Sequence, residues 1–167
     1  MRYIHLAMLL LFGLLQVSTT AKDAKPSVGL NPGSLSPDLL VADREGVEHS
    51  LSDYSGKRVL LNFWAAYDSP SRERNIRFSQ ALNQSVSSDV AYLSVSLDHY
   101  LSVYEGTVDL DGLQPQQQFV YKQGERNVLM KQFKLNKGLQ NFLIDEHGVI
   151  VARNVSPEEL AQSLELE

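Results

Sequence analysis

The sequence predicts an α/β domain in which a central mixed β-sheet is flanked by helices. Two nearly continuous apolar runs, residues 58–64 and 89–97, are typical of strands that are buried on both faces of a sheet. Residues 68–70 (DSP) lie between them and mark a helix start, so this region is a predicted β-α-β unit. Near the end of the chain, two shorter apolar runs flank residues 146–148 (EHG), which is the pattern of a β-hairpin.

The part of the chain before the first buried strand is predicted to carry two weak strands. Residues 38–42 and 46–50 are joined by a turn-like tetrapeptide at 43–46 (DREG), and a second turn at 52–57 (SDYSGK) follows them. Because both strands precede the β-α-β unit, we expect them to form an N-terminal β extension.

The helix that follows the first buried strand has two candidates for its N-cap. With Ser69 as the N-cap, Pro70 takes the first helical position, which suits both residues. Asp68 is the alternative cap. Residues at roughly helical spacing then define the expected helix: Ile76, Phe78, Ala81, Leu82, Ser85 and Val86.

Residues 98–123 follow the second buried strand and give the weakest pattern in the chain. We expect a short helix within 98–112 (DHYLSVYEGTVDLDG) and an extended piece at 117–121 (QQFVY). A helical pattern at 127–135 then leads to the hairpin.

The C-terminal part is predicted to be a hairpin followed by a helix. The hairpin strands are residues 140–145 and 149–153. The last helix opens with a capping box, in which Ser156 is the N-cap, Pro157 is at N1 and Glu159 is at N3. Six aromatic residues of the chain are expected to fill the core: Phe63, Trp64, Phe78, Phe119, Phe133 and Phe142.

The composition excludes several classes of function. Hydrophobic residues make up 43% and charged residues 21% of the 167 residues, which is ordinary for a globular protein. The formal net charge is −5 and no run of Lys or Arg stands out, so no nucleic-acid partner is expected. The chain has no cysteine, which excludes disulfides, thiol catalysis, iron–sulfur clusters and thiolate-bound zinc. The scattered histidines give no metal-binding pattern, and we expect neither a metal nor a cofactor.

The first residues have the pattern of a secretory signal peptide. Arg2 supplies a positive charge, residues 6–15 form a short apolar run, and residues 19–21 (TTA) are small enough for cleavage. The run is shorter than the ~20 residues of a membrane-spanning helix, so no stable span is expected after cleavage. An uncleaved anchor is the alternative.

These segments predict an exported protein of three parts. Residues 1–21 are the signal peptide, residues 22–37 are an irregular arm rich in Pro, Gly and Ser, and residues 38–167 are the domain. We expect the mature protein in a bacterial periplasm.

Three segments resemble a known family. Residues 33–38 (GSLSPD) are similar to the Gly-x-x-Ala-Pro-Asp opening of exported thioredoxin-like reductases and peroxiredoxins. Residues 51–67 (LSDYSGKRVLLNFWAAY) and 137–151 (KGLQNFLIDEHGVIV) resemble the LSDYKGKVVLLNFWATW and GxPTTFLIDxxGxIV segments of the same proteins. The chain thus resembles the TlpA/ResA-like branch of the thioredoxin superfamily, which overlaps the redoxin (AhpC/TSA) family. This resemblance implies a thioredoxin-like fold over roughly residues 33–165.

The chain departs from the family at the positions that carry its chemistry. The two cysteines of the family's Trp-Cys-x-x-Cys-Arg motif correspond to Asp68 and Ser71, and the cis-proline of its substrate loop corresponds to Leu139. A cis bond before a residue other than proline costs about 3 kcal/mol, so a trans bond and a reshaped groove are expected at Leu139. Without a thiolate, disulfide exchange and peroxidase chemistry are both lost, and we expect no enzymatic activity.

Asp68 has a physical reason to stand where the family has a reactive cysteine. The N–H groups and the dipole at a helix N-terminus stabilise a thiolate, and a carboxylate gains the same stabilisation of about 0.3–1 kcal/mol. The simpler role for Asp68 is therefore a helix cap. The alternative is that Asp68 and Arg72 contact polar groups of a bound partner.

Two other kinds of site find little support in the sequence. Ser69 and Ser71 lie in no Gly-x-Ser-x-Gly elbow and have no histidine nearby in sequence, so a hydrolase is not expected. Residues 109–112 (DLDG) resemble a fragment of a calcium loop, but the remaining oxygen ligands are missing and a solvated turn is favoured.

The sequence leaves two functional hypotheses. In the first, the protein is a redox-inactive, thioredoxin-like module that holds a peptide or an envelope protein in the former substrate groove. In the second, which follows from the resemblance alone, an oxidoreductase or antioxidant role survives only through a partner's thiols. Tyr67 precedes the helix start and is either exposed beside the groove or half-buried in packing. The candidate binding residues of the first hypothesis are Tyr67, Asp68, Ser69, Ser71, Arg72 and Leu139.

Overall fold

The computed structural model of the chain describes residues 26–84, 90–122 and 124–165. Within them, seven strands form one sheet in the order β2-β1-β5-β4-β3-β6-β7. The segment 1–21 that is predicted as a signal peptide lies outside the described residues, as do Ser85 and Val86 of the predicted first helix. In the part of the chain that is described, no helix combines the length and the apolar character needed to cross a membrane.

The centre of the sheet is built by strand β3 (Arg58–Trp64). It pairs in parallel with β4 (Val90–Ser96), and β4 pairs in parallel with β5 (Gln118–Tyr121). On its other side β3 pairs antiparallel with β6 (Asn141–Ile144), which forms a hairpin with β7 (Ile150–Arg153). The prediction of a mixed sheet that ends in a hairpin is therefore confirmed.

The predicted N-terminal strands extend this sheet at its far edge. Strand β1 (Leu40–Ala42) pairs antiparallel with both β5 and β2 (Glu48–Ser50). The described part of the irregular arm that precedes them, residues 26–37, reaches the opposite edge. There the N–H group of Gly33 donates to the carbonyl of Ile150 at 2.8 Å, and the N–H group of Ile150 donates to the carbonyl of Ser34 at 2.9 Å.

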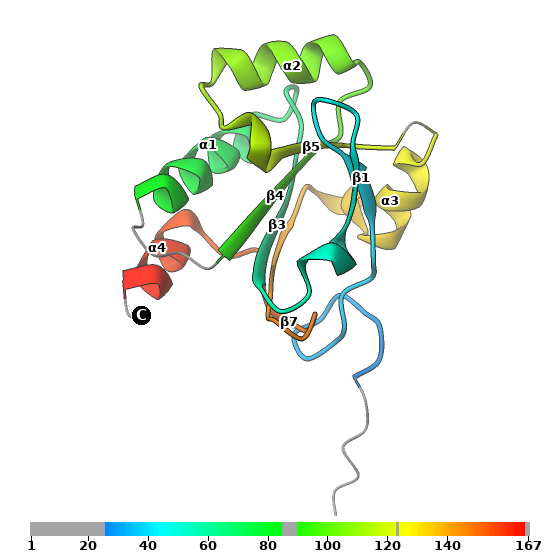
Figure 1. The fold of residues 1–167 in the computed structure, drawn as a ribbon, viewed down its shortest axis with the longest axis vertical. Helices are drawn as coiled ribbons and strands as arrows, with labels where there is room; N and C mark the ends of the chain where they lie inside the picture. The colour runs from blue at the N-terminus through cyan, green and yellow to red at the C-terminus, as the bar shows by residue number, and fades with distance from the viewer. Residues whose placement is uncertain (1–25, 85–89, 123, 166–167) are drawn as a thin grey trace, which may run out of the picture.

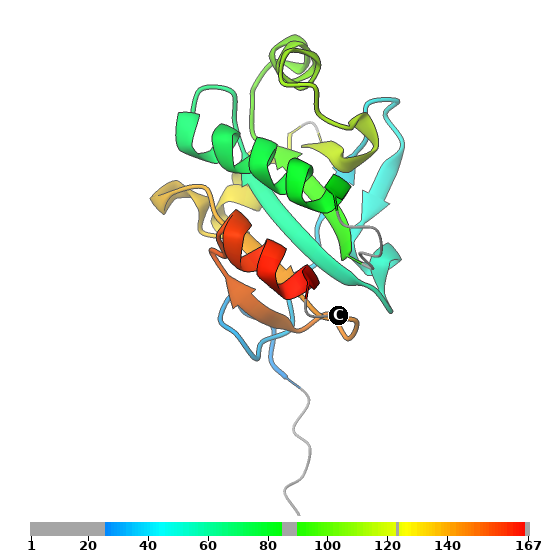
Figure 2. The same cartoon turned by 90° about the vertical axis from the view of Figure 1, so that its left-hand side faces the viewer.

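Helices cover both faces of the sheet (Figure 1). Helices α1 (Ser69–Gln84) and α4 (Pro157–Glu165) lie side by side on one face, as Figure 2 shows. Helix α3 (Arg126–Gln132) lies on the opposite face, and α2 (Leu101–Leu110) lies beyond one end of the sheet. Short 3-10 helices span Leu51–Tyr54, Pro115–Gln117 and Leu135–Lys137.

The core is divided by the alternation of side chains along β3. Val59, Leu61 and Phe63 belong to the cluster on the α3 side, whereas Leu60 packs with the residues of α1 and α4. Trp64 packs against Tyr104 of α2. The six aromatic residues that the sequence assigns to the core are all buried: Phe63, Trp64, Phe78, Phe119, Phe133 and Phe142.

The structure corrects one predicted helix boundary and one predicted turn. The helix expected at 127–135 ends at Gln132, because Lys134 has a left-handed backbone (φ 53°) that an α-helix does not accommodate. The turn expected at 52–57 begins as a 3-10 helix that is capped by Ser50 and Asp53. The final helix has the predicted capping box, since Ser156 and Glu159 exchange hydrogen bonds of 2.7 and 3.1 Å.

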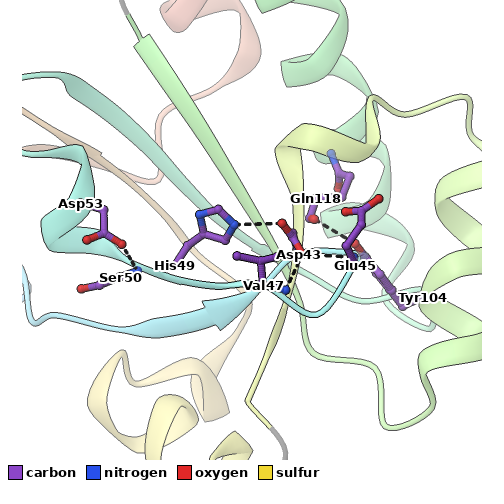
Figure 3. Close-up of polar contacts among 8 residues, drawn as sticks. All are labelled: Asp43, Glu45, Val47, His49, Ser50, Asp53, Tyr104 and Gln118. Atoms are coloured by element: carbon purple, nitrogen blue, oxygen red, sulfur yellow. Dashed lines mark hydrogen bonds and ion pairs between the residues drawn. The ribbon is translucent and has the colours of Figure 1, made fainter.

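The turn between β1 and β2 is organised by Asp43 (Figure 3). Its Oδ1 accepts the N–H groups of Glu45 and Val47 at 3.1 and 2.8 Å, and its Oδ2 lies 3.0 Å from Nε2 of His49. The hydrogen bond to His49 and those to the backbone hold the pKa of Asp43 below its ordinary value. The carboxylate form of Asp43 therefore stabilises this hairpin.

We expect Asp43→Asn to destabilise the protein at neutral pH and to flatten the acid limb of its stability curve. A lowered folded-state pKa means that the contribution of Asp43 is present above about pH 3.8 and is lost as the pH falls through the folded-state value. Asparagine keeps the Oδ1 acceptor but loses the charge. Urea unfolding between neutral and acidic pH measures this, with Glu45→Gln in the same turn as the control. An acid limb of unchanged slope in Asp43→Asn would contradict the assignment.

Candidate functional site

Helix α1 begins at Ser69, and the preceding residue, Asp68, is its N-cap. The Oδ1 atom of Asp68 accepts the N–H group of Ser71 at 2.9 Å, and its carbonyl accepts the N–H group of Arg72 at 3.0 Å. Of the two N-cap candidates in the sequence, Asp68 is therefore the one that caps the helix, and Ser69 is not. Pro70 lies at the second helical position, where its missing N–H group is also unneeded.

The second degenerate cysteine position, Ser71, faces inward. Its side chain is 1% exposed, and its hydroxyl donates to the carbonyl of Asp68 at 3.0 Å and accepts the N–H group of Ala65 at 3.3 Å. These partners include no base that could activate the hydroxyl as a nucleophile. The helix start thus holds a carboxylate and a buried hydroxyl, neither of which can exchange a disulfide.

A buried carboxylate, that of Asp98, holds the segment between β3 and α1 in place. Asp98 is 7% exposed, and its two oxygens accept the N–H group of Ala66 at 3.0 and 3.1 Å and the hydroxyl of Ser96 at 2.8 Å. Tyr67 follows this anchor and is 66% exposed, so of the two alternatives for it the structure shows an exposed side chain and not a half-buried one. A guanidinium nitrogen of Arg126 lies 3.4 Å from its hydroxyl.

Arg72, another predicted binding residue, is engaged within the protein. Its guanidinium donates to both carboxylate oxygens of Asp111, at 2.7 and 2.5 Å, and this interaction raises the pKa of Arg72 above its ordinary value. The side chain of Asp111 is only 7% exposed. The expected solvated turn at 109–112 is therefore wrong in part, because Asp109 and Leu110 complete α2 and Asp111 joins its end to α1.

Leu139 lies in the loop that precedes β6, and its position is set by an arginine that the sequence did not single out. No cis peptide bond occurs among the described residues, so the expected trans bond at Leu139 is confirmed. Its carbonyl accepts a hydrogen bond from Nη2 of Arg74 at 3.0 Å. The same guanidinium donates to Asn62 Oδ1 at 3.2 Å and to the carbonyl of Phe63 at 3.3 Å. Burial lowers the pKa of Arg74, although an arginine stays charged in proteins.

A groove of about 600 Å³ lies beside Leu139. It is bounded by α1, by the loop at 137–141 and by the connection from β7 to α4 at 153–157. Of the predicted binding residues, only Leu139 lines this groove; Asp68 and Ser71 serve the helix start, and Tyr67 lies outside its lining. The lining residues that the sequence did not single out include Arg74, Lys137 and Arg153.

The sequence did not indicate that these three cations lie together, because they are far apart along the chain. Arg74 reaches a carbonyl that is 65 positions away, Lys137 ends the 3-10 helix Leu135–Lys137, and Arg153 ends strand β7. Short-range patterns cannot bring such residues together. In the described part of the chain, no group of three or more His, Asp or Glu side chains is arranged to hold a metal ion.

The chain matches a known family over most of its length. The model of the AhpC/TSA family matches residues 32–153. A thioredoxin-like protein of known structure from Parabacteroides distasonis is 38% identical, covers 82% of this chain and 96% of its own, and has a TM-score of 0.68. The thioredoxin domain of a thiol-disulfide oxidoreductase from Bacteroides vulgatus has a TM-score of 0.73 over 83% of this chain and 98% of its own, at 23% identity. The predicted thioredoxin-like fold is therefore confirmed.

Two curated relatives are similar over shorter stretches. The thiol-disulfide oxidoreductase ResA of Geobacillus thermodenitrificans is 40% identical over 63 residues, which are 38% of this chain and 36% of ResA. The thioredoxin-like protein YneN of Bacillus subtilis is 42% identical over 50 residues, 30% of this chain and 29% of YneN. The matched region thus spans about a third of each relative's own length.

We expect Asp68→Ala to lower the free energy of unfolding by about 1 kcal/mol, because the mutant loses the side-chain acceptor for the N–H group of Ser71. Chemical denaturation measures the change. Ser69→Ala is the matched control, since it alters the neighbouring residue that is not the cap and should shift stability little. If Ser69→Ala proved the more destabilising of the two, the assignment of the cap would be wrong.

Proposed function

This chain belongs to the AhpC/TSA family, and we propose that it is a redox-inactive member that holds a segment of another protein in the groove beside Leu139. The observation that carries the proposal is a thioredoxin-like fold in which other residues stand at the two cysteine positions of the family. The fold and the helix start persist, while the two cysteine positions hold Asp68 and Ser71. A groove is still open at the former substrate loop.

The replacements favour binding over catalysis. Disulfide exchange needs a thiolate that attacks and a second thiol that resolves the mixed disulfide. Asp68 uses its carboxylate to cap α1, and Ser71 is buried beneath it. The groove lies beside these residues and depends on neither of them for its walls, so losing the sulfurs leaves a binding surface intact.

We propose further that the protein acts outside the cytoplasm. The pattern of residues 1–21, with Arg2, an apolar run and small residues, supports export through a cleaved signal peptide to a bacterial periplasm. A partner in this compartment would be an envelope or periplasmic protein, or a peptide derived from one.

Photo-crosslinking in cells tests the groove directly. A photoreactive residue at Leu139 or at Glu73, which both line the groove, is expected to capture the same discrete partner. Val47 is the control, because it is 56% exposed on the turn at the opposite edge of the sheet. Identical labelling from all three positions, or no discrete product from Leu139 and Glu73, would refute the groove as the binding site.

The second hypothesis, an oxidoreductase role through a partner's thiols, is supported by the names of the relatives alone. We expect the purified protein to give only the background rate in a disulfide-reductase assay, because it has no sulfur nucleophile. The double variant Asp68→Cys and Ser71→Cys is the positive control, since it returns two thiols to the N-terminus of α1. Turnover by the unmodified chain, above the rate without protein, would contradict redox inactivity.

A further inference from the structure

We propose that the groove recognises an acidic partner, namely an extended segment of another protein that is rich in Asp and Glu. This inference rests on the proposed function and adds to it the chemistry of the bound chain. It follows from the charges that line the groove, from the bonding of Arg74 and from the engagement of the Leu139 carbonyl.

The groove is lined by an excess of positive side chains. Glu73 is its only acidic lining residue among the described residues. One of the cations, Arg77, forms an ion pair with Glu158. The other three form no ion pair in the described part of the chain, and the carboxylates near them are Glu73 in the lining and Asp68, which attracts Arg74 electrostatically. The cations of the groove therefore outnumber the carboxylates beside them. The cationic lining residues are Arg74, Arg77, Lys137 and Arg153.

Arg74 carries the most restricted of these charges. Its hydrogen bonds go only to neutral oxygens, those of Asn62, Phe63 and Leu139. Within the described residues, its Nη1 group has no acceptor. A partly buried guanidinium gains most from a carboxylate, because charged pairs form the shorter and stronger hydrogen bonds. The part of the groove that Arg74 lines is therefore suited to an anionic group.

The positive surface continues beyond the groove. A neighbouring depression along α3 and the 3-10 helix after it is lined by Lys131, Lys134 and Lys137, and it shares Lys137 with the groove. Inside the described ranges, none of these lysines is part of an ion pair. The chain as a whole has a formal charge of −5, so this concentration of cations creates a local field opposite to that of the whole protein. Such a field steers and selects an acidic partner.

The bonding of Leu139 indicates that side chains carry the recognition. A peptide that binds by strand addition needs free backbone acceptors and donors in its receptor. At Leu139 the carbonyl already accepts a hydrogen bond from Arg74. The groove has the size of ordinary ligand pockets, which fits a single extended chain. The net negative charge of the protein disfavours the alternative of a flat anionic membrane, whose field acts on the whole molecule.

Fluorescence anisotropy with labelled peptides tests the inference. The probe is a short peptide rich in Asp and Glu, and its comparison is the same peptide with Asn and Gln in their places. We expect the acidic peptide to bind about tenfold more tightly at low salt and to lose this advantage at high salt.

Matched charge reversals locate the binding surface. We expect Lys137→Glu to weaken binding of the acidic peptide about tenfold. Lys57→Glu makes the same change at an exposed position that follows the 3-10 helix at Leu51–Tyr54 and does not line the groove, and it should leave affinity within about twofold. Because Lys137 is exposed and has no ion pair among the described residues, the protein is expected to fold normally; urea unfolding checks this. Arg153→Gln, a second groove variant, should weaken binding in the same direction.

Several outcomes would overturn the inference. Equal affinity for the acidic and the neutral peptide would remove charge as the basis of recognition, and equal losses for Lys57→Glu and Lys137→Glu would assign the effect to net charge. Binding to phosphatidylglycerol vesicles but not to the peptide, with the same dependence on Lys137, would assign the surface to lipid. If Leu139 captures a discrete partner while acidic peptides fail to bind, the proposed function stands and the acidic specificity fails. If Leu139 captures none, the proposed function itself fails.

Discussion

The groove depends on the hydrogen bonds that the guanidinium group of Arg74 donates. It extends from α1, donates to Asn62 and Phe63 of β3, and donates again to the carbonyl of Leu139. Hydrogen bonds from a charged group contribute about 1.5–3 kcal/mol each, so the three bonds tie helix, sheet and loop together strongly. The loop before β6 is therefore held in place by a side chain. The thioredoxin-like family has a proline in this loop, and this chain has Leu139 in its place.

The same bonds explain why the groove carries a positive charge. Taking a guanidinium partly out of water is unfavourable by several kcal/mol unless polar partners and other charges offset it. Arg74 donates its hydrogen bonds to neutral oxygens of the protein, and its charge is offset only by electrostatic attraction from carboxylates such as Asp68, with which it forms no ion pair. The acidic partner that we propose would add a carboxylate within hydrogen-bonding distance of this guanidinium. In this way one residue links the shape of the groove to the charge of the proposed partner.

The start of α1 shows how the scaffold survives the loss of its sulfurs. A helix N-terminus has unpaired N–H groups and a positive dipole end, and both are satisfied by any suitably placed anion. Asp68 supplies that anion and accepts the N–H group of Ser71. Ser71 fills the small buried space behind it and bonds to Ala65 and Asp68. Electrostatically the helix start is maintained, although the chemistry of a thiolate is absent.

The sequence predicted most of the fold because its signals are local. The bounds of β3 followed from a single apolar run, and the start of α4 followed from Ser156 and Glu159, three positions apart. The site was predicted less completely. Leu139 was identified by its place in a family pattern, whereas Arg72 was a candidate contact for a partner, and its pairing with Asp111, 39 positions away, was not predicted. No local rule predicts such a pairing, because it depends on where α2 ends relative to α1.

Without cysteine, the groove can bind a partner only through noncovalent contacts, such as those of its charged side chains. A thiol-disulfide enzyme holds its substrate through a covalent bond that forms and breaks, so its groove needs little affinity of its own. A groove without sulfur must supply all of its affinity from noncovalent contacts. Exposed charges such as Lys137 add modest amounts each and are screened by salt, so several must act together around a more buried one. The half-buried Arg74 and the exposed lysines beside the groove, Lys131, Lys134 and Lys137, are arranged in this way. Binding of this kind is reversible and selective for charge, which suits a protein that holds a partner without modifying it.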